Sequence, residues 1–173
     1  MRTFILSITT LFASVFIFSS CSKNKSEPQP CTYDSCATKA PASEILAVQH
    51  YLDSAGITAT QHCSGLFYTI ETAGAGNAPN ACQDIGVRYK GMLTNGNVFD
   101  SSNQEIPLNL GFVIQGWRNT VPMLKQGGKM TLYIPPTLGY GKDPQYNPRK
   151  PTEVLIPGNS ILIFNVELVA VYE

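Results

Sequence analysis

The chain has 173 residues, of which 43% are hydrophobic, and its 12 basic side chains balance its 12 acidic ones. A formal net charge of zero without any cluster of lysine and arginine excludes the electrostatic footprint of a nucleic-acid-binding protein. We therefore expect one domain of ordinary size with a short extension, and no nucleic-acid partner.

The N-terminus has the organisation of an export signal. Arg2 supplies a positive charge, and residues 4–18 are apolar apart from small hydroxyl side chains. This stretch is shorter than the roughly 20 residues that a membrane-spanning helix needs. It leads into the sequence Phe-Ser-Ser-Cys, which resembles a bacterial lipobox, so we expect residues 1–20 to be a signal peptide and Cys21 to carry lipid. An ordinary secretory signal followed by an unrelated cysteine is the alternative.

A flexible tether is expected over residues 21–41. Residues 22–30 are polar, contain two prolines and two lysines, and show no apolar period. Lipid on Cys21 would anchor the protein to a bacterial membrane in the cell envelope, facing the periplasm or exposed at the surface.

Four further cysteines follow the proposed lipidation site: Cys31, Cys36, Cys63 and Cys82. An even number in an exported protein favours disulfides over metal or catalytic thiols. Of the three possible pairings we favour Cys31 with Cys36, which share one short loop, and Cys63 with Cys82, which bracket one strand and its turn. The two histidines do not have the spacing of zinc ligands, so no metal site is expected.

A helix is predicted over residues 43–55. Ser43 can cap its start, and Gly56 is suited to its end. Its apolar face comprises Ile45, Val48 and Leu52. This helical extension, residues 42–63, is either a small element packed on the main domain, which we favour, or an arm for docking or dimerisation.

From residue 65 onward the pattern changes to short strands separated by glycine, proline and asparagine turns. Apolar residues alternate in four segments, near residues 66–70, 85–93, 130–134 and 162–168. The sequence Thr-Asn-Gly-Asn at residues 94–97 predicts a hairpin turn. Residues 116–124 are the one plausible second helix, which Pro122 makes short or irregular. The pattern indicates an α+β fold with a mainly antiparallel sheet and one small helix against its inner face.

Motifs of several enzyme classes are absent from the sequence. It has no G-x-S-x-G elbow, no phosphate-binding glycine loop, no metal-ligand pattern and no convincing set of histidine, carboxylate and nucleophile. Aromatic and aliphatic residues gather instead at strand ends and turns. This distribution is typical of an apolar pocket with few polar groups.

Five segments, in order, resemble the FKBP-type peptidyl-prolyl isomerases. They are VRYKGML at residues 87–93, NGNVFDSS at 95–102, LNLGFVIQGW at 108–117, LGYG at 138–141 and IPGNS with the following LIFNVEL at 156–168. The resemblance implies an isomerase domain over residues 64–173, with an antiparallel twisted sheet wrapped around one short helix.

The resemblance also implies a proline-binding pocket. Its catalytic residues would be Tyr89, Phe99, Asp100, Tyr140 and Phe164, and its substrate-binding residues Leu108, Val113, Ile114, Trp117 and Ile156. In the family the tryptophan is the floor under the proline ring. The backbone N–H of Ile114 and the hydroxyl of Tyr140 would donate hydrogen bonds to carbonyls of the bound segment. Alternation independently places Tyr89 and Phe164 on inner faces of their strands.

The implied activity is peptidyl-prolyl cis-trans isomerisation without a cofactor, assisting the folding of exported proteins. The X-Pro amide would be desolvated and twisted in the apolar pocket. Expected partners are proline-containing segments of exported proteins, with macrolide inhibitors as further candidate ligands. The alternatives are a non-catalytic proline-binding or chaperone lipoprotein with the same fold, and an anchored structural lipoprotein.

Three features depart from the family pattern and bear on substrate preference. Leu108 stands where phenylalanine is common, which predicts a thinner wall and a roomier pocket. Gly158 replaces the second proline of a usual pair. The segment of residues 142–155 is longer than in minimal members, contains three prolines, and is expected to overhang the pocket.

Overall fold

The computed structural model describes residues 31–172. The predicted signal peptide, the lipidation site Cys21 and the first part of the expected tether lie outside these residues. Within them, no helix combines the length and the apolar character needed to cross a bilayer.

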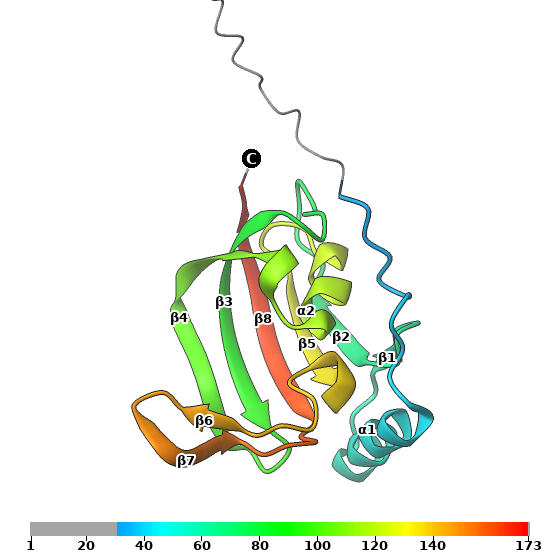
Figure 1. The fold of residues 1–173 in the computed structure, drawn as a ribbon. Helices are drawn as coiled ribbons and strands as arrows, with labels where there is room; N and C mark the ends of the chain where they lie inside the picture. Colours follow the sequence, from blue (N-terminus) through cyan, green and yellow to red (C-terminus); the bar gives the residue numbers. More distant parts are fainter. Residues whose placement is uncertain (1–30, 173) are drawn as a thin grey trace, which may run out of the picture. The chain divides into compact units, whose positions relative to one another are not determined.

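The fold is α+β and is built on a six-stranded sheet in the order β1-β2-β5-β8-β3-β4, in which all neighbours are antiparallel (Figure 1). The strands are β1 (Thr60–Gln61), β2 (Phe67–Thr72), β3 (Asp84–Leu93), β4 (Val98–Asn109), β5 (Lys129–Ile134) and β8 (Leu162–Val171). The predicted turn at residues 94–97 joins β3 to β4, where the Gly96 N–H donates to the Leu93 carbonyl at 2.9 Å. The predicted sheet is therefore confirmed, with its long strands adjacent to one another.

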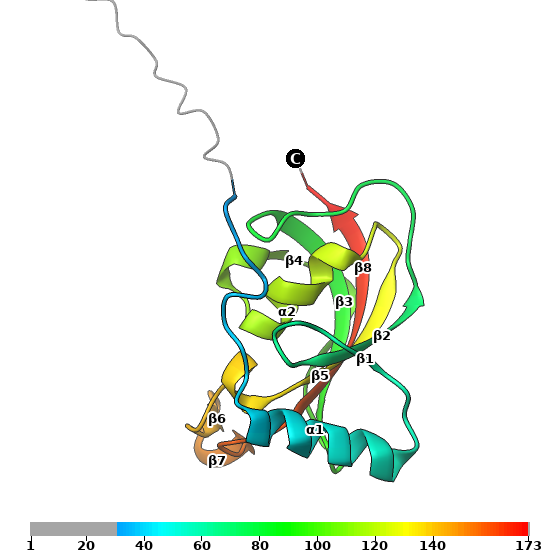
Figure 2. The ribbon, with the colours of Figure 1, turned by 90° about the vertical axis from the view of Figure 1, so that its right-hand side faces the viewer.

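The main core lies between the inner face of this sheet and α2 (Gln115–Thr120) (Figures 1 and 2). Alternate strand residues point toward the helix and are fully buried, among them Ile85, Leu132 and Leu162. The helix is shorter than the predicted range of residues 116–124, because Pro122 cannot continue its hydrogen bonding. A 3-10 turn, Val121–Met123, follows instead.

A second, smaller core lies on the other face of the sheet, under α1 (Ala42–Ala55). Val48 and Leu52 of the helix pack against Phe67, Tyr133 and Ile163, which alternate with the residues of the main core. This arrangement agrees with the interpretation of α1 as an element packed on the main domain.

The start of α1 differs from the prediction. The N-cap residue is Pro41, with no side-chain cap, and Ser43 lies in the first turn. Glu44 in that turn faces the domain, accepting hydrogen bonds from the N–H and hydroxyl of Thr137 at 2.8 and 2.7 Å. The helix ends as predicted at Gly56, whose φ of 66° is left-handed.

The disulfide pairing expected from the sequence is wrong. Cys31 is joined to Cys82, and Cys36 to Cys63. Closeness in sequence favoured the other pairs, but the chain from residue 31 runs beside α2 toward α1 (Figure 2), which brings each cysteine to a distant partner. Arg118 of α2 lies over the ring of Tyr33 at 3.9 Å and donates to the Ala81 carbonyl, next to Cys82. From residue 31 on, the segment that we expected to be tether is attached to the domain.

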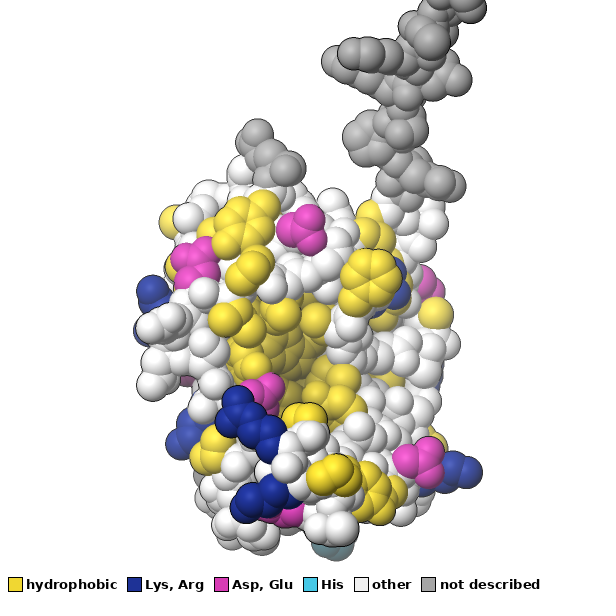
Figure 3. Space-filling model, turned by 60° about the vertical axis from the view of Figure 1, so that its left-hand side comes forward, with side chains coloured by type: hydrophobic (Ala, Val, Ile, Leu, Met, Phe, Trp, Pro, Cys, Tyr) yellow, Lys and Arg dark blue, Asp and Glu magenta, His cyan; other side chains and the backbone are white. Residues whose placement is uncertain are grey.

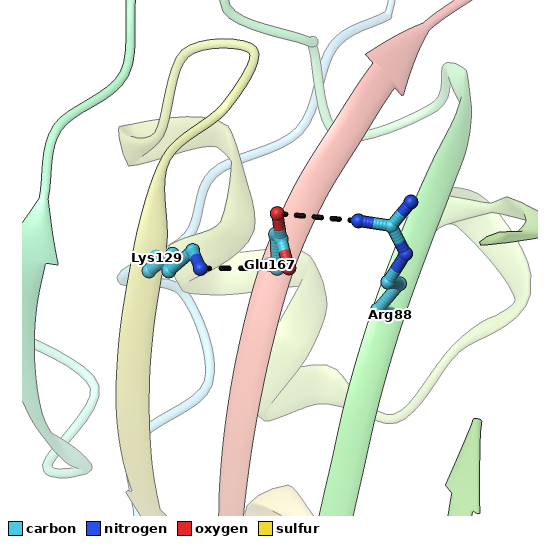
Figure 4. Close-up of polar contacts among 3 residues, drawn as sticks. All are labelled: Arg88, Lys129 and Glu167. Carbon is cyan, nitrogen blue, oxygen red and sulfur yellow. Dashed lines mark hydrogen bonds and ion pairs between the residues drawn. The ribbon is translucent and has the colours of Figure 1, made fainter. Parts of the chain in front are cut away.

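Charged side chains cross the outer face of the sheet. Glu167 of β8 lies between Arg88 of β3 and Lys129 of β5, at 3.4 and 3.7 Å (Figure 4). All three side chains are partly exposed, so each pair contributes at most about 1 kcal/mol to stability.

The long segment after the LGYG sequence forms a second, two-stranded sheet, with β6 (Gln145–Asn147) paired to β7 (Lys150–Ile156). This hairpin stands beside the ends of β3 and β4 in Figure 1. Hairpin residues line one cavity together with Phe99 and Asp100 of β4.

Candidate active site

A pocket of about 270 Å³ opens between α2 and the part of the sheet formed by β3, β4 and β8. Figure 3 shows it as a hollow lined by hydrophobic side chains, with charged side chains at its rim. Its lining consists of Tyr89, Asp100, Leu108, Phe112, Val113, Ile114, Trp117, Tyr140 and Phe164. Asp100 carries the one formal charge among them.

The base of the pocket is a set of aromatic rings packed edge to face. Trp117 meets Tyr89 at a ring-centroid distance of 5.4 Å and Phe164 at 5.2 Å, with interplanar angles of 82° and 87°. Phe99 also packs edge to face against Phe164, at 5.4 Å. Each such pair contributes about 0.5–1.5 kcal/mol beyond its burial, so the rings hold one another in fixed orientations.

Gly91 on β3 makes this ring packing possible. A Cβ atom at this position would lie 2.7 Å from ring carbons of both Phe99 and Phe164. Any side chain at this position would displace both rings, of which Phe164 lines the pocket. A glycine two residues after Tyr89 in β3 is therefore required for the close approach of these rings.

The polar side of the pocket is a pair of groups from neighbouring strands. The Tyr89 hydroxyl donates to Asp100 Oδ2 at 2.6 Å. Burial and this carboxylate raise the pKa of Tyr89, and the same two causes raise the pKa of Tyr140. Both hydroxyls therefore keep their protons at neutral pH and act as hydrogen-bond donors.

Three donors around the pocket have no acceptor within residues 31–172. The indole N–H of Trp117 is buried without a partner. The backbone N–H of Ile114, just before α2, and the hydroxyl of Tyr140 are not used in the hydrogen bonding of the described part of the chain either. A bound segment could supply carbonyl oxygens to the Ile114 N–H and the Tyr140 hydroxyl, whereas the indole nitrogen is buried beneath the pocket surface.

The structure brings together most of the predicted site residues. Eight of them line the pocket: Tyr89, Asp100, Leu108, Val113, Ile114, Trp117, Tyr140 and Phe164. Phe99 and Ile156 instead line an adjoining cavity of about 560 Å³ under the β6–β7 hairpin, together with Asp100 and Tyr140. The two cavities meet at Asp100 and Tyr140.

Phe112 lines the pocket but was not predicted from the sequence. It ends the 3-10 turn Leu110–Phe112, and 91% of it is exposed. The turn is fixed by Asn109, whose side chain accepts from the Gly111 N–H and donates to Asp84. Phe112 lies within the segment LNLGFVIQGW, and among its mostly apolar neighbours nothing in the sequence distinguishes it as a pocket residue.

One group of potential metal ligands lies elsewhere in the described residues. The side-chain ligand atoms of Cys36, His62 and Cys63 are within 4.8 Å of one another. Both cysteines are joined in a disulfide and offer no thiolate in this state. Burial lowers the pKa of His62, which favours the neutral form of its imidazole ring.

The sequence matches the family model of the FKBP-type peptidyl-prolyl cis-trans isomerases over residues 76–169. A probable FKBP-type peptidyl-prolyl cis-trans isomerase of Haemophilus influenzae is 41% identical over 111 residues, which are 62% of this chain and 43% of that protein. FkpA of Escherichia coli K12, an FKBP-type peptidyl-prolyl cis-trans isomerase, is 40% identical and is covered over 38% of its length. The chain thus spans less than half the length of these relatives.

Solved structures give the same result. A peptidyl-prolyl cis-trans isomerase of Pseudomonas syringae superposes with a TM-score of 0.64 at 29% identity, covering 79% of this chain and 99% of that one. The crystal structure of Escherichia coli FkpA superposes with a TM-score of 0.62 at 34% identity, over 75% of this chain and 60% of the other.

Proposed function

This chain belongs to the FKBP-type peptidyl-prolyl cis-trans isomerases, and we propose that it catalyses rotation about X-Pro bonds in exported proteins. The observation that carries the proposal is the set of edge-to-face contacts among Tyr89, Trp117 and Phe164. They form a rigid apolar floor under a pocket of about 270 Å³, a volume suited to one proline ring and its neighbouring amide.

The reaction needs no nucleophile. Rotation about an X-Pro bond is opposed by a barrier of about 18–20 kcal/mol, because amide resonance is lost as the bond twists. The planar amide is the more dipolar state and is the better solvated by water. Transfer into an apolar pocket removes that solvation, so the twisted state is stabilised relative to the planar one.

Hydrogen-bond donors at the rim would hold the segment while the bond rotates. Ile114 and Tyr140 both line the pocket, and the N–H of Ile114 and the hydroxyl of Tyr140 are free to donate to backbone carbonyls. Contacts to carbonyls that do not rotate fix the chain on both sides of the proline. The rotating amide is then left in the apolar part of the pocket.

We assign Asp100 an orienting role at the polar edge. Its carboxylate accepts from Tyr89 at 2.6 Å, and the tyrosine ring is itself part of the aromatic floor. The hydrogen bond thereby connects the edge of the pocket to its base. Loss of either group would loosen the ring that the proline contacts.

The cellular role belongs to the same proposal. The signal-like N-terminus and Cys21 favour a lipid-anchored protein of the cell envelope, acting on proline-containing segments of exported proteins. The two disulfides suit an oxidising compartment. Macrolides that occupy a proline pocket would compete with these segments. Incorporation of labelled palmitate that is lost in Cys21→Ala tests the anchor.

A second candidate function is non-catalytic binding of proline-containing or unfolded chains. The observation that favours it is Phe112, a fully presented aromatic side chain at the mouth of the pocket. An isomerisation assay on a proline peptide separates the two: the enzyme accelerates exchange at substoichiometric concentration, whereas a binding module changes only the equilibrium populations.

A further inference from the structure

The cavity under the β6–β7 hairpin continues the proline pocket. Both cavities are bordered by Asp100 and Tyr140, so they adjoin at these two residues. An extended chain advances about 3.3 Å per residue. A substrate residue one or two positions from a proline in the pocket therefore reaches the hairpin cavity. Whether that residue lies before or after the proline depends on the direction in which the substrate chain binds.

Arg149 is held at the tip of the hairpin, where it lines this cavity. The Asn147 side chain accepts from the Arg149 backbone N–H at 2.9 Å, which fixes the turn. The base of the hairpin is fixed too, because the Asn159 N–H donates to the Gly141 carbonyl at 2.9 Å. At Gly158, a Cβ atom would stand 2.0 Å from the Lys142 carbonyl oxygen, so a residue with a side chain would force this base apart.

The guanidinium of Arg149 has no ion pair or hydrogen bond within residues 31–172, since the nearest carboxylate on the hairpin is used elsewhere. Glu153 Oε2 lies 3.3 Å from Lys150 Nζ and accepts from Asn147 Nδ2 at 3.2 Å. Asp100 also lines the cavity, but it is bonded to Tyr89 on the side of the proline pocket. Arg149 is therefore the one unpaired cation that a bound segment meets there.

We propose that Arg149 determines substrate specificity by binding an acidic side chain that lies one or two residues from the proline. A guanidinium presents several N–H donors in a planar fork that matches a carboxylate. The proposal rests on the function inferred above and adds a class of preferred substrate to it. Asp100, which also lines the cavity, disfavours a carboxylate near itself, so the acidic side chain is directed toward the guanidinium at the hairpin tip.

The test uses two series of proline peptides, with Glu, Ala or Lys placed before the proline in one and after it in the other. Binding is followed by the fluorescence of Trp117, which is the sole tryptophan of the chain and forms the pocket floor. Isomerisation of the same peptides is measured in parallel. The neutral Ala peptides measure isomerase activity in the absence of a charged side chain. A protein that binds these peptides without accelerating their isomerisation would refute the proposed function but not the role of Arg149 in binding.

Arg149→Glu is compared with Lys142→Glu, which makes the same change in net charge at an exposed residue of the same loop that lines neither cavity. In one of the two series we expect Arg149→Glu to lower the ratio of Glu-peptide to Lys-peptide affinity by about threefold to tenfold, and salt to reduce the difference. Lys142→Glu should leave this ratio near that of the unmodified protein. Equal ratios for the unmodified protein and Arg149→Glu in both series, or an equal shift in Lys142→Glu, would overturn the proposal.

Discussion

The hydroxyl of Tyr89 donates a 2.6 Å hydrogen bond to Asp100, and so joins β3 to β4 at the edge of the aromatic pocket. The same tyrosine ring contacts Trp117 edge to face. One residue thus connects the polar edge of the site to its apolar floor.

Tyr89→Phe removes this bond and keeps the ring. We expect kcat/KM for a proline peptide to fall about tenfold, because the loss of a hydrogen bond to a charged group at a partly exposed site costs on the order of 1.5 kcal/mol. Tyr172→Phe is the matched control, since Tyr172 also donates to a carboxylate, that of Glu105, away from the pocket. Equal activity of the two variants would contradict the role given to Tyr89.

Phe99→Ala combined with Asp100→Ala should abolish turnover. Phe99 packs edge to face against Phe164, and Asp100 orients Tyr89, so two rings that line the pocket lose their fixed positions. Circular dichroism should show that the protein remains folded. Val98→Ala, at an exposed position of the same strand, is expected to retain activity; turnover undiminished in the double variant would refute the site.

The disulfide pairs are directly testable by peptide mapping under non-reducing conditions. The expected products join Cys31 to Cys82 and Cys36 to Cys63. Replacing both Cys36 and Cys63 by serine should lower the free energy of unfolding by about 2–4 kcal/mol, because the cross-link restricts the unfolded chain. Recovery of a peptide that joins Cys31 to Cys36 would contradict the fold of this segment.

The stability of the protein should decline at alkaline pH partly through Tyr89. Burial and Asp100 raise its pKa in the folded state, whereas the unfolded chain releases the proton near about pH 10. Above this pH the folded state binds more protons than the unfolded state, so the free energy of unfolding falls as the pH rises. Below this pH Tyr89 is protonated in both states, and its contribution to the free energy of unfolding does not change with pH. Urea unfolding at several pH values should show a smaller decline for Tyr89→Phe, and an identical decline would contradict the shift.

Order and alternation of residues were enough to predict the sheet and the short helix, whereas most of the pocket was predicted from the resemblance to the FKBP-type isomerases. Tyr89, Trp117 and Phe164 could be placed because each lies in a long segment with a family pattern. Strand alternation alone assigned Tyr89 and Phe164 to inner faces. Both kinds of prediction depend on patterns that are local in the sequence: the alternation of residues along a strand and the order of residues within a motif.

Features set by contacts between distant segments were not predictable in this way. The disulfides depend on how residues 31–41 cross α2, and the sequence gives only the spacing of the cysteines. The prediction that Ser43 caps α1 was wrong, because the extended segment ends at Pro41 and α1 already begins at Ala42. Phe112 and the position of Arg149 depend on turns whose geometry is fixed by the side chains of Asn109 and Asn147.

An isomerisation assay of the protein beginning at residue 22 tests the central claim most directly. Exchange between the cis and trans forms of a neutral proline peptide is measured at substoichiometric protein, with the Phe99→Ala, Asp100→Ala variant beside it. We expect acceleration by the unmodified protein and none by the variant. A folded protein that binds the peptide, as reported by Trp117 fluorescence, yet leaves its exchange rate unchanged would contradict catalysis and favour a binding function.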